Sequence, residues 1–231
     1  MKILGIVPAR SGSKGFRHKN ISEISGKSLL ELAVITGKDC PLITDLYVST
    51  DSKHYEQIAK RKGALSAGLR PKRLSGDNVK TVDVVIHLLN QLKTAYDYVI
   101  LLQPSSPVRS CEQIIKMFSI LKKHKKANAI VTVEAVSEPH PHKMKKMNQK
   151  GFLESLMKGT SSEMPRQKLP PVFKLTGAVY IVKTSALLKE RSMLPCSTLG
   201  YVTERTINID HETDLEILKI FLKKRLIKIG H

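Results

Sequence analysis

Short apolar runs alternate with amphipathic stretches along the first 136 residues of this chain. The runs at residues 3–7 and 98–102 have the unbroken hydrophobicity of strands that are buried in a parallel sheet. Two shorter strands are predicted at residues 45–49 and 129–133. Helical spacing of the apolar positions predicts helices at residues 29–37, 52–62, 81–92 and 110–123. This alternation predicts an α/β fold with a doubly wound, mostly parallel sheet.

The second half of the chain has a different pattern. Residues 137–176 are rich in Pro, His, Lys and Met, which predicts short antiparallel strands and loops. A strand is then predicted at residues 177–182, another at 206–209, and a final helix at 211–225. We therefore expect residues 1–231 to form a single domain with an inserted arm or lid at about residues 137–176.

Composition places the chain among cytoplasmic proteins. Apolar residues make up 41%, which suffices for a sizeable core, and no run approaches the roughly 18 apolar residues of a membrane span. Pro8 and Arg10 interrupt the first apolar stretch too early for a signal peptide. The cysteines are far apart and lack metal-type spacing, so we expect free thiols in a reducing compartment at Cys40, Cys111 and Cys196.

The net charge of +19 indicates polyanionic ligands, and both nucleic acids and nucleotide phosphates qualify. There is no Trp, and the eleven Phe and Tyr residues form no cluster on which bases could stack. Runs such as residues 122–126 are typical of solvated helix ends. Nucleotide phosphates are therefore the favoured ligands, and a non-catalytic RNA- or phosphate-binding module is the less favoured alternative.

The segment Pro-Ala-Arg-Ser-Gly-Ser-Lys-Gly, residues 8–15, carries the strongest chemical signal and directly follows the first predicted strand. Its glycines and serines allow backbone N–H groups to close around an anion. Four cations lie within ten residues in and just after this segment, at Arg10, Lys14, Arg17 and Lys19. The spacing matches neither a P-loop nor a dinucleotide-binding fingerprint. A basic loop for a polyphosphate and a flexible basic turn both fit this pattern.

Several polar residues are predicted to lie at the same edge of the sheet as this loop. Asp51, Gln103 and Asp210 each follow a predicted strand. Ligands of open α/β sheets bind outside the carboxyl ends of the strands, so these side chains are expected to converge there with the basic loop.

Four segments together resemble the acylneuraminate (nonulosonic acid) cytidylyltransferases, the CMP-sialic acid synthetase family. They are residues 8–15 with Lys19-Asn20, Leu69-Arg70-Pro71 with Leu74-Ser75-Gly76-Asp77, Leu102-Gln103-Pro104-Ser105-Ser106-Pro107-Val108-Arg109, and residues 177–181 with 207–210. The resemblance spans nearly the whole chain. It implies a Rossmann-like nucleotidyltransferase domain with a small arm that pairs two subunits into a homodimer.

The same resemblance implies the reaction: CMP is transferred from CTP to a nine-carbon keto-sugar acid, pyrophosphate is released, and Mg²⁺ assists. Legionaminic acid, pseudaminic acid and deoxy-octulosonate are alternative acceptors, and UTP or GTP an alternative donor. Triphosphate binding is implied for Arg10, Ser13, Lys14 and Lys19, and a catalytic role for Arg10, Lys14, Lys19 and Asp210. Cytidine recognition is implied for Asn20, Arg70 and Thr81. Contact with the sugar acid is implied for Gln103, Lys143, Arg166, Tyr180 and Asn208.

Some of these positions have simpler interpretations as well. Arg70 would also suit a solvated loop, and Gln103 could have a structural role in a turn that Pro104 and Pro107 fix. Arg166 has a clear chemical purpose, because a planar guanidinium binds the carboxylate of a sugar acid with two hydrogen bonds.

Asp210 is the metal candidate, because Mg²⁺ takes one or two carboxylates together with phosphate oxygens. An Asp directly before a helix is also a favoured N-cap, and both roles can hold. Here the sequence departs from its relatives, which usually have Asp-Ile-Asp where this chain has Asn208-Ile209-Asp210, and commonly Asn where it has Thr176. Losing one carboxylate either weakens metal binding or marks a different sugar.

Overall fold

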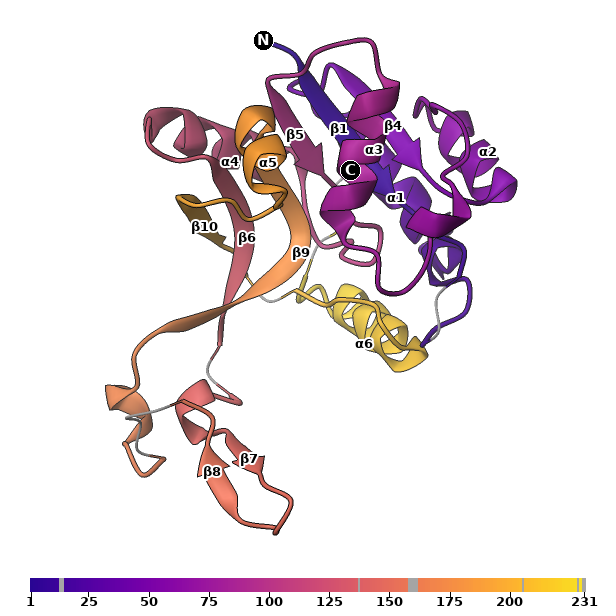
Figure 1. Ribbon diagram of the computed structural model, residues 1–231. Coiled ribbons are helices and arrows are strands. Elements are labelled where there is room, and N and C mark those ends of the chain that lie inside the picture. Colours follow the sequence, from indigo (N-terminus) through magenta and orange to yellow (C-terminus); the bar gives the residue numbers. More distant parts are fainter. Residues whose placement is uncertain (13–14, 137, 158–161, 205, 228, 230–231) are drawn as a thin grey trace.

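The computed structural model describes residues 1–12, 15–136, 138–157, 162–204, 206–227 and 229. A six-stranded sheet lies at its centre (Figure 1). Its strands are β1 (Ile3–Pro8), β4 (Asp45–Ser49), β5 (Tyr98–Leu101), β6 (Ala129–Val136), β9 (Val172–Lys183) and β10 (Thr198–Val202). The helices of the described residues are α1 (Leu29–Lys38), α2 (Lys53–Arg61), α3 (Thr81–Gln91), α4 (Cys111–Lys123), α5 (Thr184–Glu190) and α6 (Glu212–Lys223).

The strands are arranged in the order β10-β6-β9-β5-β1-β4. β1 pairs in parallel with both β4 and β5, and β10 pairs in parallel with β6. Only β9, among these strands, runs antiparallel to its neighbours β5 and β6. The predicted mostly parallel sheet is therefore confirmed.

Helices cover both faces of the sheet, as β1 shows most directly. Successive side chains of a strand point to opposite faces. Ile3 and Val7 join a core built with α1, α2 and α4, whereas Leu4 and Ile6 join a core built with α3 and α5. All four side chains are at most 1% exposed. This three-layer packing is the doubly wound arrangement that the alternation of elements predicts.

Helix α6 belongs to a third, separate core at the carboxyl end of the sheet. Its Leu215 and Leu218 pack with Leu29 and Leu32 of α1 and with Ile209. Ile24 of β2 (Glu23–Ile24), which pairs with β3 (Lys27–Ser28), also joins this core. This packing places residues 208–210, which precede α6, beside the loop that follows β1.

The strand predicted at residues 206–209 is wrong. The segment alternates polar and apolar residues because Ile209 is fully buried in the third core, not because it pairs in a sheet. The segment is instead bonded to the loop after β5, where Ile209 N donates to Ser105 O at 2.8 Å. The last strand of the chain is instead β10, which forms one edge of the sheet, contains Gly200 and was not predicted.

An arm leaves the body along β6 and β9 (Figure 1). We use this name for the described residues between 134 and 175. The two long strands stay paired from Val133 with Leu175 out to Val136 with Val172. At the end of the arm, β7 (Lys145–Met147) and β8 (Leu153–Ser155) form an antiparallel pair. The predicted change to antiparallel strands is confirmed, although β9 already begins five residues before the predicted strand at 177.

The first turn of α1 is closed by a capping box, which also fixes the preceding hairpin. Ser28 N donates to Glu31 Oε2 at 2.8 Å, and Glu31 N donates to Ser28 Oγ at 3.2 Å. Lys62 Nζ lies 3.2 Å from Glu31 Oε1. Burial by itself raises the pKa of Glu31, but the hydrogen bonds from Ser28 and the Lys62 ammonium outweigh it, so the pKa is lowered.

None of the described helices is long and apolar enough to cross a membrane.

We expect Glu31→Ala to lower the free energy of unfolding by about 1 kcal/mol at pH 7, because the capping box is lost. A carboxylate whose pKa is lowered by folding stabilises the protein fully above its ordinary pKa of 4.5 and progressively less as the pH falls through the folded value. Urea unfolding at pH 7 and pH 3.5 measures both effects. Glu216→Ala, which removes an exposed partner of Lys219, is the control. An equal loss at both pH values would contradict this account.

Candidate active site

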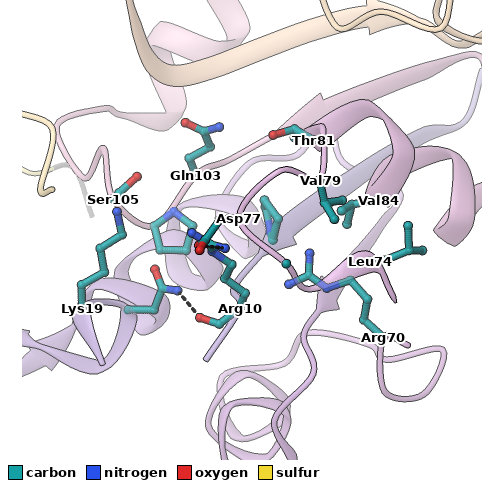
Figure 2. A pocket seen from close by; sticks show the side chains of 14 residues that line it. Arg10, Lys19, Arg70, Leu74, Asp77, Val79, Thr81, Val84, Gln103 and Ser105 are labelled. Carbon is teal, nitrogen blue, oxygen red and sulfur yellow. Dashed lines mark hydrogen bonds and ion pairs between the residues drawn. The ribbon is translucent and has the colours of Figure 1, made fainter. Parts of the chain in front are cut away.

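A pocket of about 260 Å³ opens at the carboxyl ends of β1 and β5 (Figure 2). Segments far apart in the chain form its walls. Its lining residues are Pro8, Arg10, Lys19, Asn20, Arg70, Leu74, Gly76, Asp77, Val79, Thr81, Val84, Gln103, Pro104 and Ser105. Six of the predicted site residues are therefore brought together here: Arg10, Lys19, Asn20, Arg70, Thr81 and Gln103.

The loop after β1 is held to the sheet by Asp51, which follows β4. Ser11 N donates to Asp51 Oδ1 at 2.8 Å, and Ser11 Oγ donates to Asp51 Oδ2 at 3.0 Å. The buried Asn20 donates through Nδ2 to the backbone oxygen of Arg10 at 2.9 Å. Asp51 and Asn20 together fix the start of the basic loop. Ser13 and Lys14, two predicted phosphate ligands, lie outside the described residues.

Two of the cations in the pocket are paired with carboxylates. Arg10 Nη1 lies 2.6 Å from Asp77 Oδ1, and Lys19 Nζ lies 3.0 Å from Asp210 Oδ1. Figure 2 shows the Arg10–Asp77 pair between Lys19 and Arg70. The Arg10 and Asp77 side chains are each about a third exposed, at 32% and 35%. A pair this exposed is weak, so a phosphate group can replace its carboxylate.

Arg70 is the buried cation of the pocket, with 7% of its surface exposed. Burial lowers the pKa of its guanidinium, an effect that Asp51 opposes and Arg10 adds to. Its Nε and Nη2 atoms are buried and have no hydrogen-bond partner among the described residues. Buried donors of this kind usually have partners. Arg70 also lines the pocket, so its guanidinium can donate to an acceptor on a bound ligand.

Gln103 leads the loop that follows β5, and this loop packs tightly against β9. Gly177 has φ of +74°, and a Cβ atom there would lie 2.6 Å from Gln103 Oε1 and 2.9 Å from Ser106 Oγ. Only glycine fits this approach without strain. Tyr180, three residues later on β9, does not line the pocket. It pairs with Leu101 and packs against the second core, and burial raises its pKa.

Lys143 and Arg166 belong to the arm, which extends away from the sheet (Figure 1). Both are exposed, and neither lines the pocket of its own chain. Lys143 ends the 3₁₀ turn Pro141–Lys143, and Arg166 begins the 3₁₀ turn Arg166–Lys168. Arg166 Nε is 4.0 Å from Glu138 Oε1. The structure therefore does not bring these two predicted sugar ligands to the pocket within one chain.

Asp210 is exposed, with 66% of its side-chain surface accessible, and it does not cap α6. The N-cap is His211, and the carboxylate that satisfies the helix start is Asp214, whose Oδ2 accepts from the backbone N of Asp210 and of His211. The N-cap interpretation of Asp210 is wrong because the helix begins one residue later.

Asp210 is also the predicted Mg²⁺ ligand. Within the described part of the chain, no three His, Cys, Asp or Glu side chains are grouped to hold a metal ion. One carboxylate beside the cation Lys19 nevertheless fits Mg²⁺, which commonly takes one or two carboxylates and completes its shell with phosphate oxygens and water.

The two departures from the relatives have different environments. Asn208 is exposed, and its Oδ1 accepts a hydrogen bond from the buried Ser106 Oγ at 2.7 Å. Thr176 is buried, and its Oγ1 donates to Thr132 Oγ1 at 2.6 Å inside the pair β6–β9. Asn208 can therefore influence the site, whereas Thr176 serves the packing of the sheet.

Known proteins are similar to this chain over nearly its whole length. Residues 4–227 match the family described as "Cytidylyltransferase". The chain belongs to the cytidylyltransferase family. The resemblance seen in the sequence is confirmed by curated relatives of this cytidylyltransferase. It is 31% identical over 221 residues to the CMP-N,N'-diacetyllegionaminic acid synthase of Legionella pneumophila, with 93% of each chain covered.

A second relative is the N-acylneuraminate cytidylyltransferase of Streptococcus agalactiae serotype III, 29% identical over 215 residues. The match covers 92% of the present chain, which spans about half (51%) of the streptococcal protein. Among solved structures, a CMP:2-keto-3-deoxy-manno-octonic acid synthetase complexed with CTP has the same fold. Its TM-score is 0.73 at 16% identity, with 97% of this cytidylyltransferase and 100% of that chain covered.

We expect Asp77→Asn to tighten the binding of inorganic tripolyphosphate by about 1.4- to 5-fold, because an exposed ion pair that competes for Arg10 contributes roughly 0.2–1 kcal/mol. Isothermal titration calorimetry measures the affinity. Asp83, on α3, is about as exposed as Asp77 and is paired with Arg191, so Asp83→Asn is the matched control. Unchanged or weaker binding by Asp77→Asn would show that phosphate does not displace this carboxylate.

Proposed function

We propose that this protein transfers CMP from CTP to the anomeric hydroxyl of a nonulosonic, sialic-type acid and releases pyrophosphate. The observation that carries this proposal is the pocket in which Arg10, Lys19 and Arg70 converge with Gln103. Relatives of the chain bear the names of enzymes for sialic and legionaminic acids, which supports the acceptor class. The free cysteines of the described residues support a cytoplasmic location, since thiols stay reduced there.

Transfer of a nucleotidyl group needs alignment and charge neutralisation more than covalent catalysis. Arg10 and Lys19 supply this charge at the mouth of the basic loop. Each is held by a carboxylate in the free protein, so each is already oriented toward the pocket. In the proposed reaction the triphosphate takes the place of these carboxylates, and the two cations stabilise the departing pyrophosphate.

The base end of the nucleotide is assigned to Arg70 and Thr81. Cytosine presents a carbonyl oxygen and an unprotonated ring nitrogen on one edge, whereas uracil presents an N–H group at the same ring position. The donor-only guanidinium of Arg70 therefore favours cytosine over uracil. Because its Nε and Nη2 atoms are buried, a mismatched base would leave them unpaired, which makes the discrimination stronger.

Asp210 is the residue that would hold Mg²⁺, as the fit of its carboxylate suggests. When bound, the ion would neutralise phosphate charge and lower the pKa of the attacking sugar hydroxyl. In the protein without ligand, the Asp210 carboxylate is ion-paired with Lys19. Release of this carboxylate as Lys19 turns to the phosphates would couple nucleotide binding to metal binding.

The arm is proposed to pair two copies of the chain. It exposes large apolar side chains that a solvated hairpin does not need, among them Met147 and Leu153 at 72% and 69%. Lys143 and Arg166 lie on this same arm, out of reach of their own pocket. A second copy would explain them, because each arm could then bring both cations to the sugar site of the other subunit.

The proposed function is tested by pyrophosphate release with Mg²⁺. CTP, UTP and GTP are each combined with N-acetylneuraminic, legionaminic and pseudaminic acids and with deoxy-octulosonate. We expect turnover with CTP and at least one nine-carbon acid. Pyrophosphate release with UTP or GTP only, or no release by a folded protein with any combination, would contradict the proposal.

We expect Asn208→Asp to lower the Mg²⁺ concentration for half-maximal turnover by about two-fold or more, since a second carboxylate strengthens a site for a hard cation. The new side chain has the same shape and keeps the oxygen that accepts from Ser106. Asn90→Asp, which adds the same charge at an exposed position of α3, serves as the control. A weaker metal dependence together with a lower rate would instead assign the Asn208 amide to the sugar.

A charge placed on the arm should separate the subunits. Phe152, 68% exposed beside β8, is the position chosen. We expect Phe152→Glu to convert a dimer into a monomer in analytical ultracentrifugation, because an interface core does not accommodate unpaired carboxylates. It should also abolish transfer to the sugar while CTP binding is kept. Leu188→Glu, on the exposed side of α5, is the control. A monomeric wild type would exclude the paired arms.

A further inference from the structure

Arg109 lies at the end of the loop that follows β5, directly before the N-cap of α4, and is 3% exposed. Its Nη1 atom donates to three backbone oxygens, those of Gln103 at 2.7 Å, Ser106 at 2.9 Å and Ala178 at 3.2 Å. Nη1 carries two hydrogens. At least one of them is therefore shared between two carbonyl groups, and all three carbonyls converge on one point.

This guanidinium is buried without a carboxylate partner among the ion pairs recorded for the described residues. Its Nε and Nη2 atoms are also buried and have no hydrogen-bond partner in the described part of the chain. Burial lowers the pKa of Arg109 to about 9, so the side chain is charged at neutral pH. An unpaired buried charge opposes folding. Stability alone therefore gives a poor account of an arginine at this position.

The three carbonyls belong to two segments, of which the loop after β5 contributes Gln103 to the lining of the pocket. Gln103 and Ser106 are in the loop after β5, whereas Ala178 is on β9, directly after Gly177. The side chain of Gln103 lies over Gly177, so closely that a Cβ there would be 2.6 Å from Gln103 Oε1. By bonding both segments, Nη1 fixes the backbone of Gln103 relative to the strand on which its side chain rests.

The same loop carries the segment with Asp210. Ser106, whose carbonyl accepts from Arg109, donates through Oγ to Asn208 Oδ1 at 2.7 Å. Ser105 O accepts from Ile209 N at 2.8 Å. A displacement of the loop would therefore move Gln103 and residues 208–210 together. Arg10 and Arg70 are held by other segments and would stay in place. Asp210, the proposed Mg²⁺ ligand and partner of Lys19, would move with the loop, so the part of nucleotide binding that is independent of the loop is the part that needs no Mg²⁺.

We propose that Arg109 is a positioning residue for the sugar-acid acceptor, acting through Gln103 and the segment 208–210 rather than by contact. It does not line the pocket. The proposal rests on the proposed function, because it assumes that Gln103 faces the acceptor. Its distinctive consequence is that a loosened Arg109 loop impairs the acceptor and spares the binding of CTP in the absence of Mg²⁺.

Arg109→Lys tests this proposal. Lysine keeps the charge but lacks the planar fork, so it cannot donate in the same geometry to all three carbonyls. With the best acceptor among N-acetylneuraminic, legionaminic and pseudaminic acids, we expect KM for the acid to rise about ten-fold or kcat to fall by as much. The calorimetric Kd of CTP, measured without Mg²⁺, should stay within about two-fold. Arg191→Lys, at an exposed arginine paired with Asp83, is the matched control.

A double-mutant cycle separates positioning from general loosening. If Arg109 acts through Gln103, Arg109→Lys should cost less in acceptor kcat/KM when Gln103→Ala is already present. A merely structural arginine would lower Tm and the active fraction, with additive effects in the cycle and equal losses for both substrates. Arg109→Gln, which keeps a two-hydrogen donor without the charge, is the second variant.

The outcomes are distinct. Acceptor kinetics unchanged in a folded Arg109→Lys variant, equal losses for CTP and acceptor, or additivity with Gln103→Ala would each overturn the positioning role. Failure of both Arg109 variants to fold, while Arg191→Lys folds, would assign Arg109 to the fold alone and also overturn it. A wild type without turnover would overturn the proposed function and this inference together, whereas an active wild type with an unaffected variant overturns this inference only.

Discussion

The parallel pairing of β1 with β4 and β5 is the constraint on which the rest of the structure depends. It aligns the ends of three strands at one edge of the sheet, so that the loops after them meet. The loop after β1 brings Arg10, the end of β4 brings Asp51 to anchor that loop, and the loop after β5 brings Gln103. The pocket is thus a consequence of strand register, and the helices on both faces serve to keep that register fixed.

Charge is arranged within this frame in two different ways. Arg10 and Lys19 are accessible and paired with the carboxylates of Asp77 and Asp210, which a phosphate can replace. Arg70 and Arg109 are buried, and each has donors without a partner among the described residues. The accessible cations suit a ligand that arrives and leaves. The buried ones suit fixed tasks, recognition of a base in one case and support of a loop in the other.

The sequence predicted the fold well where apolar runs had a single explanation. Residues 3–7 and 98–102 are apolar on both faces, and they form central strands. Residues 206–209 are half polar, and the strand predicted there is wrong because Ile209 is buried in the third core without pairing in the sheet. Of the six predicted pocket residues, Arg10, Lys19 and Gln103 were found in segments that follow predicted strands. Asn20, Arg70 and Thr81 were found through the family resemblance. The positions of Lys143 and Arg166 relative to the pocket could not be predicted, because a local sequence does not say how far an arm extends. Arg109 had no assigned role because burial of a cation is set by tertiary packing.

The most direct test of the account is a crystal structure of the protein with CTP. The triphosphate is expected against Arg10 and Lys19, with the Asp77 carboxylate withdrawn from Arg10 and the base beside Arg70 and Thr81. Arg109 should keep its bonds to the carbonyls of Gln103, Ser106 and Ala178. Nucleotide bound away from this pocket, or bound with the Arg10–Asp77 pair intact and Arg70 unengaged, would contradict the assignment of the site.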